Sequence, residues 1–261
     1  MLWLAGSVLL AYLAVVGLAY YNQEALLYPA PRGAGGSMPG YRDVAYEADD
    51  GLLLSGGYHQ AAPGKPTLLF FHGNAATWQS TAQILAPLAD AGYGVFAASY
   101  RGYRANPGTP SEAGLYRDAR AAAAWLAANG VGPDDLVIVG NSLGSGPAVE
   151  LARTMRPRGL VLISPFASMT EVAAANLRWL PVEWLMRDRY DNAAKLPEVS
   201  APVLILHGDR DTLIPLSHAQ RLARLARNGT LVIVRQTGHE LVAREQTPAL
   251  MSDWLDELPA R

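Results

Sequence analysis

Seven short apolar runs, each of strand length, alternate with helical patterns along this chain, and this alternation constrains the fold most. The runs are Leu52–Tyr58, Thr67–Phe71, Gly94–Ala98, Leu136–Val139, Leu160–Ile163, Val203–Leu206 and Leu231–Val234. Helical periodicity is found at Thr77–Ala91, Ser111–Asn129, Leu143–Met155, Ser217–Ala226 and Thr247–Leu258. Strands that are buried on both faces read as continuous apolar runs. The pattern therefore predicts an α/β fold with a mostly parallel sheet of about eight strands and helices on both faces.

The N-terminal segment, residues 1–23, carries no charged side chain, and Leu2–Tyr21 is almost wholly apolar. A helix needs about 20 such residues to cross a hydrocarbon layer about 30 Å thick. Trp3 near one end and Tyr20 at the other suit the lipid–water interface. We therefore expect one N-terminal transmembrane helix that acts as a single-pass membrane anchor.

A cleaved signal peptide is the alternative for this segment, because Gly17-Leu18-Ala19 offers a small-x-small cleavage site. Against it, no basic residue precedes the apolar run, and the run exceeds the about 7–15 residues usual for a signal. So few charges flank the segment that the sequence does not predict which side of the membrane holds the rest of the chain.

The remainder of the chain divides into a linker and one domain. Residues 24–42 are rich in proline and glycine and are predicted as a linker. Residues 43–261 show no internal repeat and are predicted as one domain, with a cap-like insertion near 165–197. The insertion mixes apolar and basic side chains, among them Trp179, Leu180, Trp184, Leu185, Met186, Arg178, Arg187 and Arg189. Such a cap either lines an acyl pocket or simply covers the sheet edge.

Composition removes several classes of function. The chain has 261 residues and a net charge of −2 without any run of Lys or Arg, so it lacks the basic surface that nucleic-acid binding requires. It contains no cysteine, which excludes disulfides, thiolate zinc sites and cysteine nucleophiles. Its five histidines are scattered singly, and it has no phosphate-binding loop or dinucleotide fingerprint. We expect no nucleic-acid partner, no metal and no cofactor.

A candidate nucleophile lies in the pentapeptide Gly140-Asn141-Ser142-Leu143-Gly144, which follows a predicted strand directly and opens a helical stretch. The two glycines allow a sharp strand-to-helix turn that holds the serine exposed in a strained conformation. The pentapeptide alone is weak, because a serine at a helix start often only caps the helix amides. Its position after a strand makes Ser142 the candidate nucleophile.

A serine hydroxyl becomes nucleophilic only when a base removes its proton and a carboxylate orients that base. Asp211 follows the strand at Val203–Leu206, and His239 follows the strand at Leu231–Val234. The chain order Ser142, Asp211, His239 is the order of a triad built on such a strand–turn–helix elbow. Asp209 is the rival acid, although a turn role suits it so close to Gly208.

The other histidines are weaker candidates for the base. His207 ends a predicted strand and suits a packed, hydrogen-bonded role, His218 lies on a predicted helix, and His59 precedes a loop. Two backbone amides are also needed to hold an oxyanion. The turn Phe71-His72-Gly73-Asn74 closes an earlier strand, so the N–H of Asn74 can face the site beside the N–H of Leu143.

These motifs together resemble a known family. The segments FFHGNA, YRGY followed by PSEAGLYRDA, GNSLGSGPA, LHGDRDTLIP and TGHE occur in this order over most of the chain after residue 67. They resemble the Bem46-like branch of the α/β-hydrolases, the ABHD13 and ABHD17 type. The resemblance implies the α/β-hydrolase fold, with Ser142 as nucleophile, Asp211 as acid, His239 as base, and Asn74 and Leu143 as oxyanion donors. It also implies an N-terminal membrane anchor.

One loop departs from the family pattern. Residues 99–104 read Ser-Tyr-Arg-Gly-Tyr-Arg where such sequences often have Asp-Tyr-Arg-Gly-Tyr-Gly, and Asn106-Pro107 replaces a small polar pair. The departure leaves the three triad residues untouched and changes the loop beside the pocket.

The motifs predict a membrane-anchored serine hydrolase, of carboxylesterase or thioesterase type, that cleaves esters or thioesters through an acyl-enzyme. Its partners are a small or lipid-like acyl substrate and, through the N-terminal helix, the membrane. A serine peptidase or amidase of related fold and a non-catalytic membrane-tethered binding module are the alternatives. The acyl chain, the leaving group and the oligomeric state are not predicted.

Overall fold

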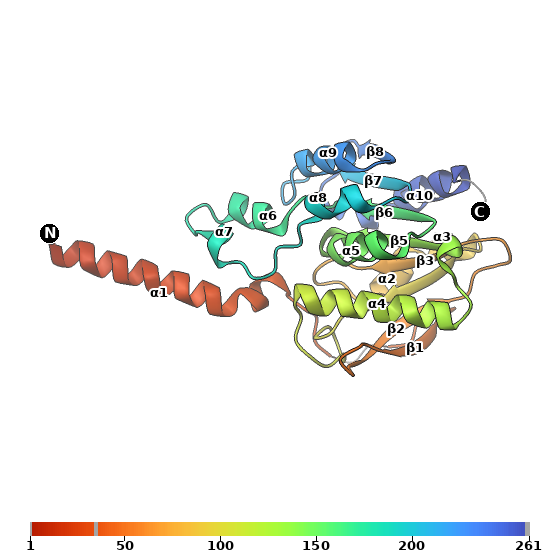
Figure 1. Cartoon of the computed structure of the whole chain (residues 1–261), viewed down its shortest axis with the longest axis horizontal. Coiled ribbons are helices and arrows are strands. Elements are labelled where there is room, and N and C mark those ends of the chain that lie inside the picture. Colours follow the sequence, from red (N-terminus) through yellow and green to blue (C-terminus); the bar gives the residue numbers. More distant parts are fainter. Residues whose placement is uncertain (1, 34–35, 259–261) are drawn as a thin grey trace.

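The structure is a computed structural model that describes residues 2–33 and 36–258. Its centre is an eight-stranded sheet in the order β1-β2-β4-β3-β5-β6-β7-β8 (Figure 1). β2 pairs antiparallel with both β1 and β4, and the other pairs are parallel. The strands are β1 Arg42–Glu47, β2 Leu53–His59, β3 Thr67–Phe71, β4 Gly94–Ala98, β5 Leu136–Asn141, β6 Gly159–Ile163, β7 Val203–Gly208 and β8 Gly229–Val234. The predicted mostly parallel sheet is confirmed.

Helices cover both faces of the sheet, as the buried strands require. Leu69 and Phe71 of β3 face one core, which α4, α5, α8 and α9 cover, whereas Leu68 and Phe70 face the opposite core, which α3 and α10 cover. The helices around the sheet have these bounds: α2 Trp78–Ile84, α3 Ala86–Asp90, α4 Glu112–Ala128, α5 Ser145–Met155, α8 Asn192–Lys195, α9 Leu216–Leu225 and α10 Gln246–Glu257. Alternate side chains of one strand thus bury two separate cores.

Two local differences from the expected elements have clear causes. β1 was not among the expected runs, because its alternating sequence RDVAYE buries only every second residue at the sheet edge. The single helix expected at Thr77–Ala91 is two helices that meet at Leu85. Pro87 lies in the first turn of the second helix, and its ring cannot follow an uninterrupted helix.

The N-terminal helix α1 spans Leu2–Leu27, so it runs past the expected boundary at residue 23. Within the described residues it is the one helix long and apolar enough to cross a membrane, over Trp3–Leu27. The segment 24–42 is not a simple linker, because it begins with the last turn of α1 and contributes the buried Tyr28 to the core. Residue 1, residues 34–35 of the expected linker and the end of the domain at 259–261 lie outside the described residues.

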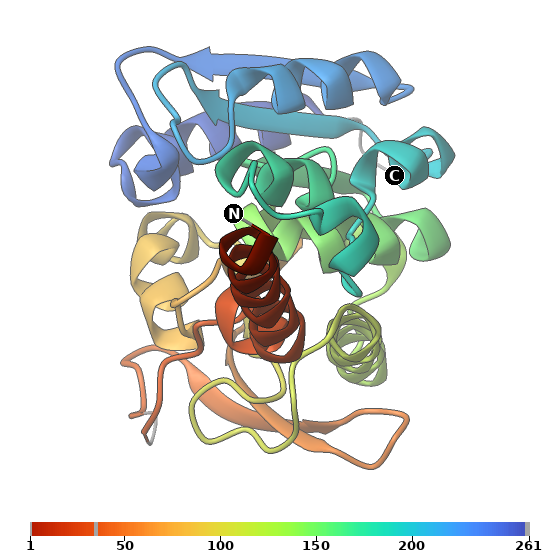
Figure 2. The ribbon, with the colours of Figure 1, turned by 90° about the vertical axis from the view of Figure 1, so that its left-hand side faces the viewer.

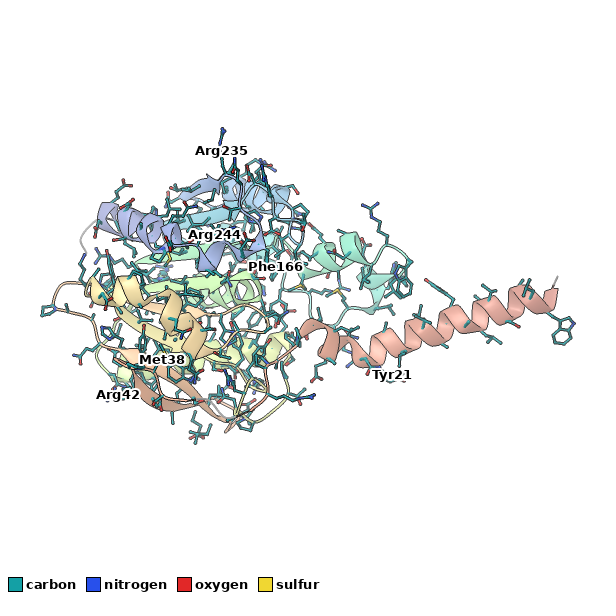
Figure 3. The ribbon with its side chains drawn as sticks, turned by 180° about the vertical axis from the view of Figure 1, so that it is seen from behind. Tyr21, Met38, Arg42, Phe166, Arg235 and Arg244 are labelled. Atoms are coloured by element: carbon teal, nitrogen blue, oxygen red, sulfur yellow. The ribbon has the colours of Figure 1, made fainter. Side chains whose placement is uncertain are left out.

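The segment at residues 165–197, which is called the cap below, follows β6 and contains α6 Met169–Asn176, α7 Val182–Leu185 and α8. α1 and the cap leave the body on the same side, with Tyr21 on α1 and Phe166 at the base of the cap (Figure 3). Figure 2 looks onto this side, with α1 pointing toward the viewer and the cap helices beside it. The side chains of Leu180, Val182 and Met186 pack with Val16, Ala19 and Leu27 of α1.

A buried ion pair fixes the loop after β4. The Arg101 guanidinium donates to Asp118 of α4 at 2.7 and 2.9 Å, and the backbone N–H of Arg101 donates to the same carboxylate at 2.9 Å. A second pair of bonds reaches Asp50 in the β1–β2 turn. The Asp118 side chain is only 1% exposed. The YRGY loop is therefore tied to a helix and to the sheet edge at once.

We expect Asp118→Ala to lower the free energy of unfolding by about 3–5 kcal/mol, because it leaves the buried guanidinium of Arg101 without its main partner. Asp49→Ala is the control, since Asp49 is 59% exposed and pairs with Arg117 at the surface, where an ion pair contributes little. Urea denaturation of the full-length protein in detergent measures both. Equal losses in the two variants would contradict this account of the loop.

Candidate active site

Ser142 lies on a tight turn between β5 and α5, within the short helix η2 (Ser142–Gly144). Its φ of +50° is in the left-handed region that non-glycine residues avoid. A Cβ on Gly144 would lie 2.0 Å from the Phe71 carbonyl oxygen, and one on Gly140 would lie 2.5 Å from the Gly144 carbonyl oxygen. Both glycines are thus required by close backbone approaches, and together they hold the serine in its strained position.

The structure brings Ser142, Asp211 and His239 together from three different strand ends. His239 Nε2 lies 2.9 Å from Ser142 Oγ, and His239 Nδ1 lies 2.8 Å from Asp211 Oδ2. Asp211 follows β7, and His239 follows β8 at the start of the short helix η4 (His239–Ala243). Because the carboxyl ends of parallel strands meet at one edge, side chains far apart in sequence form one chain of hydrogen bonds.

The electrostatics of Asp211 set the direction of this chain of hydrogen bonds. Burial raises the pKa of the Asp211 carboxyl, but the hydrogen bond from His239 and the backbone amide of Ile214 outweigh burial and hold the pKa below its ordinary value. Asp211 Oδ1 accepts the amides of Leu213 and Ile214 at 3.0 and 2.9 Å. An ionised carboxylate only accepts, so Nδ1 of His239 carries a proton and Nε2 of the neutral ring can accept one from Ser142.

The rival residues have other partners. Asp209 is exposed and accepts the amide of Thr237, so it joins the turns after β7 and β8. His207 is buried, and its Nε2 lies 2.9 Å from the Ile214 carbonyl oxygen. His218 Nδ1 accepts the amide of Ala167, and His59 Nδ1 lies 2.8 Å from the Gly40 carbonyl oxygen. These contacts give each rival a structural role.

The turn after β3 lies against the serine turn. A Cβ on Gly73 would lie 3.4 Å from Ser142 Cβ and 2.9 Å from Asn141 Nδ2, so the backbone at Gly73 touches the turn that holds Ser142. The side chain of the following residue, Asn74, is fixed from two sides. Its Oδ1 accepts from the Tyr103 hydroxyl at 2.8 Å, and its Nδ2 donates to the Leu27 carbonyl at 2.7 Å.

Three further residues, Tyr103, Leu27 and His72, support this turn. His72 was expected within the turn, but no supporting role was predicted for the side chain of any of the three. Tyr103 lies in the YRGY segment, which was the available signal, whereas the contact of Leu27 with Asn74 joins residues far apart in the chain. His72 is buried, and burial lowers its pKa to about 4, so the ring is neutral at neutral pH. Its Nδ1–H donates to the Gly73 carbonyl at 2.8 Å, which holds the turn from inside.

No group of three or more His, Asp or Glu side chains within residues 2–33 and 36–258 is placed to hold a metal ion. The polar groups that meet at this sheet edge are a hydroxyl, an imidazole, a carboxylate and the backbone of two turns. Such a set can activate a hydroxyl and hold an anion without any further group.

A mostly parallel sheet with a serine on a strained strand–turn–helix elbow defines an α/β-hydrolase. Two comparisons with protein families agree with this class: residues 66–196 match the alpha/beta hydrolase fold family, and residues 173–256 match the TAP-like protein family. The chain belongs to the α/β-hydrolase family, and its similarity to ABHD12 and ABHD17B supports the resemblance to the Bem46-like ABHD branch.

Relatives and solved structures extend this assignment. An uncharacterized protein of Mycobacterium tuberculosis H37Rv is 38% identical over 234 residues, which cover 86% of this chain and 83% of that protein. The lysophosphatidylserine lipase ABHD12 of Danio rerio is 35% identical over 181 residues, which cover 62% of this chain and 47% of that protein. The esterase Pf2001 of Pyrococcus furiosus shares the fold, with a TM-score of 0.69 at 21% identity over 88% of this chain and 97% of that chain. The Pf2001 structure shows the shared fold alone, and the family match together with the similarity to a lipase supports a hydrolase.

We expect His72 to make the protein less stable in mild acid. Between pH 6.5 and about 4 the unfolded chain binds a proton at His72 that the folded protein excludes, so stability falls as the pH falls through this window. From pH 7 to pH 5 this amounts to about 2 kcal/mol.

His72→Asn is the matched variant, because its amide can keep the bond to Gly73 but does not titrate. Burial also lowers the pKa of His207 and His218, and these contributions are present in both proteins and cancel in the difference. Urea denaturation at the two pH values measures the difference. If the free energy of unfolding falls equally with pH in the two proteins, His72 is not the cause of the loss of stability in acid.

Proposed function

We propose that the chain is a serine hydrolase that cleaves carboxylic esters or thioesters through an acyl-enzyme. The observation that carries the proposal is the hydrogen-bonded chain Ser142, His239, Asp211, with distances of 2.9 and 2.8 Å. A hydrolase that uses this set needs a nucleophile that solvent and substrate can reach, a base whose free nitrogen faces it, and a buried carboxylate behind the base. Each requirement has its residue here.

In the proposed mechanism, Ser142 Oγ attacks the acyl carbonyl carbon while His239 Nε2 takes the hydroxyl proton. The carbonyl oxygen becomes an oxyanion, which the backbone N–H groups of Asn74 and Leu143 stabilise. His239 then gives its proton to the departing alcohol or thiol, and the acyl-enzyme remains on Ser142. A water molecule repeats the sequence, with His239 as base and then as acid, and releases the carboxylic acid.

Asp211 acts on this reaction through His239. Its carboxylate holds the Nδ1–H tautomer and stabilises the imidazolium that forms when Nε2 takes the proton. The amides of Leu213 and Ile214 fix the carboxylate, so it cannot rotate away from the ring. Asp211 is expected to stay ionised at neutral pH because its pKa lies below the ordinary value.

Membrane anchoring through α1 is the second part of the proposal. The helix is uncharged over most of its length, and its N-terminal half is exposed along the described residues. A long exposed apolar helix is costly in water and stable in a bilayer. The lipase and esterase names of related proteins support an ester or lipid substrate. The same fold also suits a serine peptidase or a non-catalytic tethered module, and the following experiments separate these from an esterase.

We expect a fluorophosphonate to form a single adduct on Ser142, because only a serine with a working base and oxyanion donors reacts rapidly with such a probe. The measurement is intact mass and peptide mapping of the full-length protein in detergent. Ser142→Ala should abolish both the adduct and the turnover of p-nitrophenyl butyrate. Absence of an adduct in a folded sample would favour the binding module, and labelling with cleavage of amides but not esters would favour the peptidase.

We expect Asp211→Asn to lower kcat by about 10⁴-fold, because the amide favours the wrong tautomer of His239 while the fold stays intact. Asp209→Asn is the matched control two residues away, and its kcat should stay within about twofold of wild type, since Asp209 contacts the Thr237 amide rather than His239. Steady-state hydrolysis of p-nitrophenyl butyrate measures both. A large loss in Asp209→Asn alone would assign the acid to Asp209.

A further inference from the structure

Two tyrosines of the YRGY segment, Tyr100 and Tyr103, donate hydrogen bonds to the turn after β3. Both side chains are fully buried. The Tyr100 hydroxyl donates to the His72 carbonyl oxygen at 2.8 Å, and the Tyr103 hydroxyl donates to Asn74 Oδ1 at 2.8 Å. The two hydroxyls therefore hold the turn on both sides of Gly73, the residue whose backbone contacts the serine turn.

The turn needs such support from outside. Ala75, its next residue, has a φ of +57°, in the left-handed region that residues other than glycine avoid. Backbone in this region persists only where the surrounding contacts hold it. Asn74 is exposed, and an exposed amide side chain is ordinarily free to bond to water. Here Nδ2 donates to the Leu27 carbonyl and Oδ1 accepts from Tyr103, so the side chain fixes the backbone to which it is attached.

The loop that presents the two hydroxyls is held by contacts of its own. The Tyr100 and Tyr103 rings meet edge to face with their centroids 5.3 Å apart, and Asn106 Nδ2 donates to the Tyr100 carbonyl at 3.1 Å. Between the tyrosines, Arg101 forms the buried ion pair with Asp118. Burial raises the pKa of both hydroxyls above the ordinary value, so each keeps its proton at neutral pH. The loop thus presents two protonated hydroxyls in defined positions.

The position of the turn matters for the proposed reaction. A donor to the oxyanion is effective only when its N–H lies about 2.7–3.1 Å from the oxygen on which charge develops. The carbonyl of a bound ester carries little charge and gains it only as Ser142 attacks. A small displacement of the Asn74 amide therefore slows the chemical step more than it weakens binding of the ester.

We infer that Tyr103 and Tyr100 are positioning residues of the oxyanion site, whose hydroxyls hold the turn so that the backbone N–H of Asn74 reaches the developing oxyanion. Neither hydroxyl takes part in the bond changes. Tyr103 acts through the Asn74 side chain, and Tyr100 acts through the His72 carbonyl. This inference rests on the proposed hydrolase function and gives the YRGY segment a part in it. Removal of one hydroxyl should then slow catalysis without weakening substrate binding.

The first test removes one hydroxyl and keeps the ring. We expect Tyr103→Phe to lower kcat for p-nitrophenyl butyrate about tenfold and to leave KM within about twofold of wild type. Removal of an oxyanion donor itself costs about 10²–10³-fold, and the loss here should be smaller because the Asn74 amide is displaced and not deleted. Tyr100→Phe should lower kcat as well. The rate of fluorophosphonate labelling of Ser142 should fall with kcat, since the phosphonyl oxygen uses the same donors.

Tyr93→Phe is the matched control. Tyr93 is 1% exposed and its hydroxyl donates to Asp256 at 2.9 Å, but it precedes β4, whereas Tyr103 follows the other end of that strand. Its kcat should stay within about twofold of wild type. Complete fluorophosphonate labelling at long times counts the folded sites, so kcat refers to folded protein in every variant. If Tyr103→Phe lowers kcat no more than Tyr93→Phe does, or changes KM as much as kcat, the positioning role is wrong.

A double-mutant cycle tests whether Tyr103 acts through Asn74. Asn74→Ala removes the acceptor of the Tyr103 hydroxyl and should lower kcat at least as much as Tyr103→Phe does. In the Asn74→Ala background, Tyr103→Phe should change kcat less than about twofold, because the hydroxyl no longer has its partner. Tyr100→Phe should keep its effect in this background, since its partner is the His72 carbonyl. Multiplicative losses from Tyr103→Phe and Asn74→Ala would show that Tyr103 acts by another route and would overturn the inference.

Failure of the positioning role is distinct from failure of the proposed function. If the wild type neither reacts with the fluorophosphonate nor hydrolyses p-nitrophenyl butyrate, the hydrolase proposal fails and this inference fails with it. If the wild type does both and the variants Tyr103→Phe and Tyr100→Phe match Tyr93→Phe, the hydrolase stands and the YRGY segment is only structural.

Discussion

The close approach of two backbones at Gly144 is the constraint on which the candidate site depends. A Cβ at this position would lie 2.0 Å from the Phe71 carbonyl oxygen, so only glycine lets the serine turn pack against the end of β3. That contact holds Ser142 in its left-handed conformation and places the Gly73 turn beside it. Ser142, the proposed nucleophile, and the turn proposed to hold the oxyanion are therefore in direct backbone contact, and this packing helps to retain the backbone strain at Ser142.

Gly208 allows a similar close approach of two backbones on the other side of the site. A Cβ on Gly208 would lie 2.2 Å from the Thr237 carbonyl oxygen, so the turn after β7 packs directly on the turn after β8. Asp211 follows the first turn and His239 follows the second, and their side chains meet at 2.8 Å. Asp211 and His239, the proposed acid and base, are thus aligned by backbone contact between the ends of neighbouring parallel strands. This alignment explains why Asp211 and His239 form the hydrogen-bonded pair, although Asp209 and His207 lie close by.

Much of this arrangement could be predicted from the sequence because it is local. Continuous apolar strands, strand-end glycines and the order of Ser142, Asp211 and His239 all follow from short segments, and the structure places the three side chains in one hydrogen-bonded chain. The polar edge strand β1 was missed because its alternating sequence contains no continuous apolar run. The extension of α1 to Leu27 and the burial of Tyr28 were missed because residues after Leu27 are rich in proline and glycine, and only contacts from distant segments order them.

Those distant contacts join α1 to the body in a way that no single segment encodes. The Tyr28 hydroxyl donates to Asp188 at 2.7 Å and lies 2.8 Å from the Tyr190 hydroxyl, while the carbonyl of Leu27 holds the Asn74 side chain. The same two residues therefore fix the direction in which α1 leaves the body and the position of the turn beside Ser142. Because one set of contacts serves both, the direction in which α1 leaves the body and the geometry of the candidate site cannot vary independently.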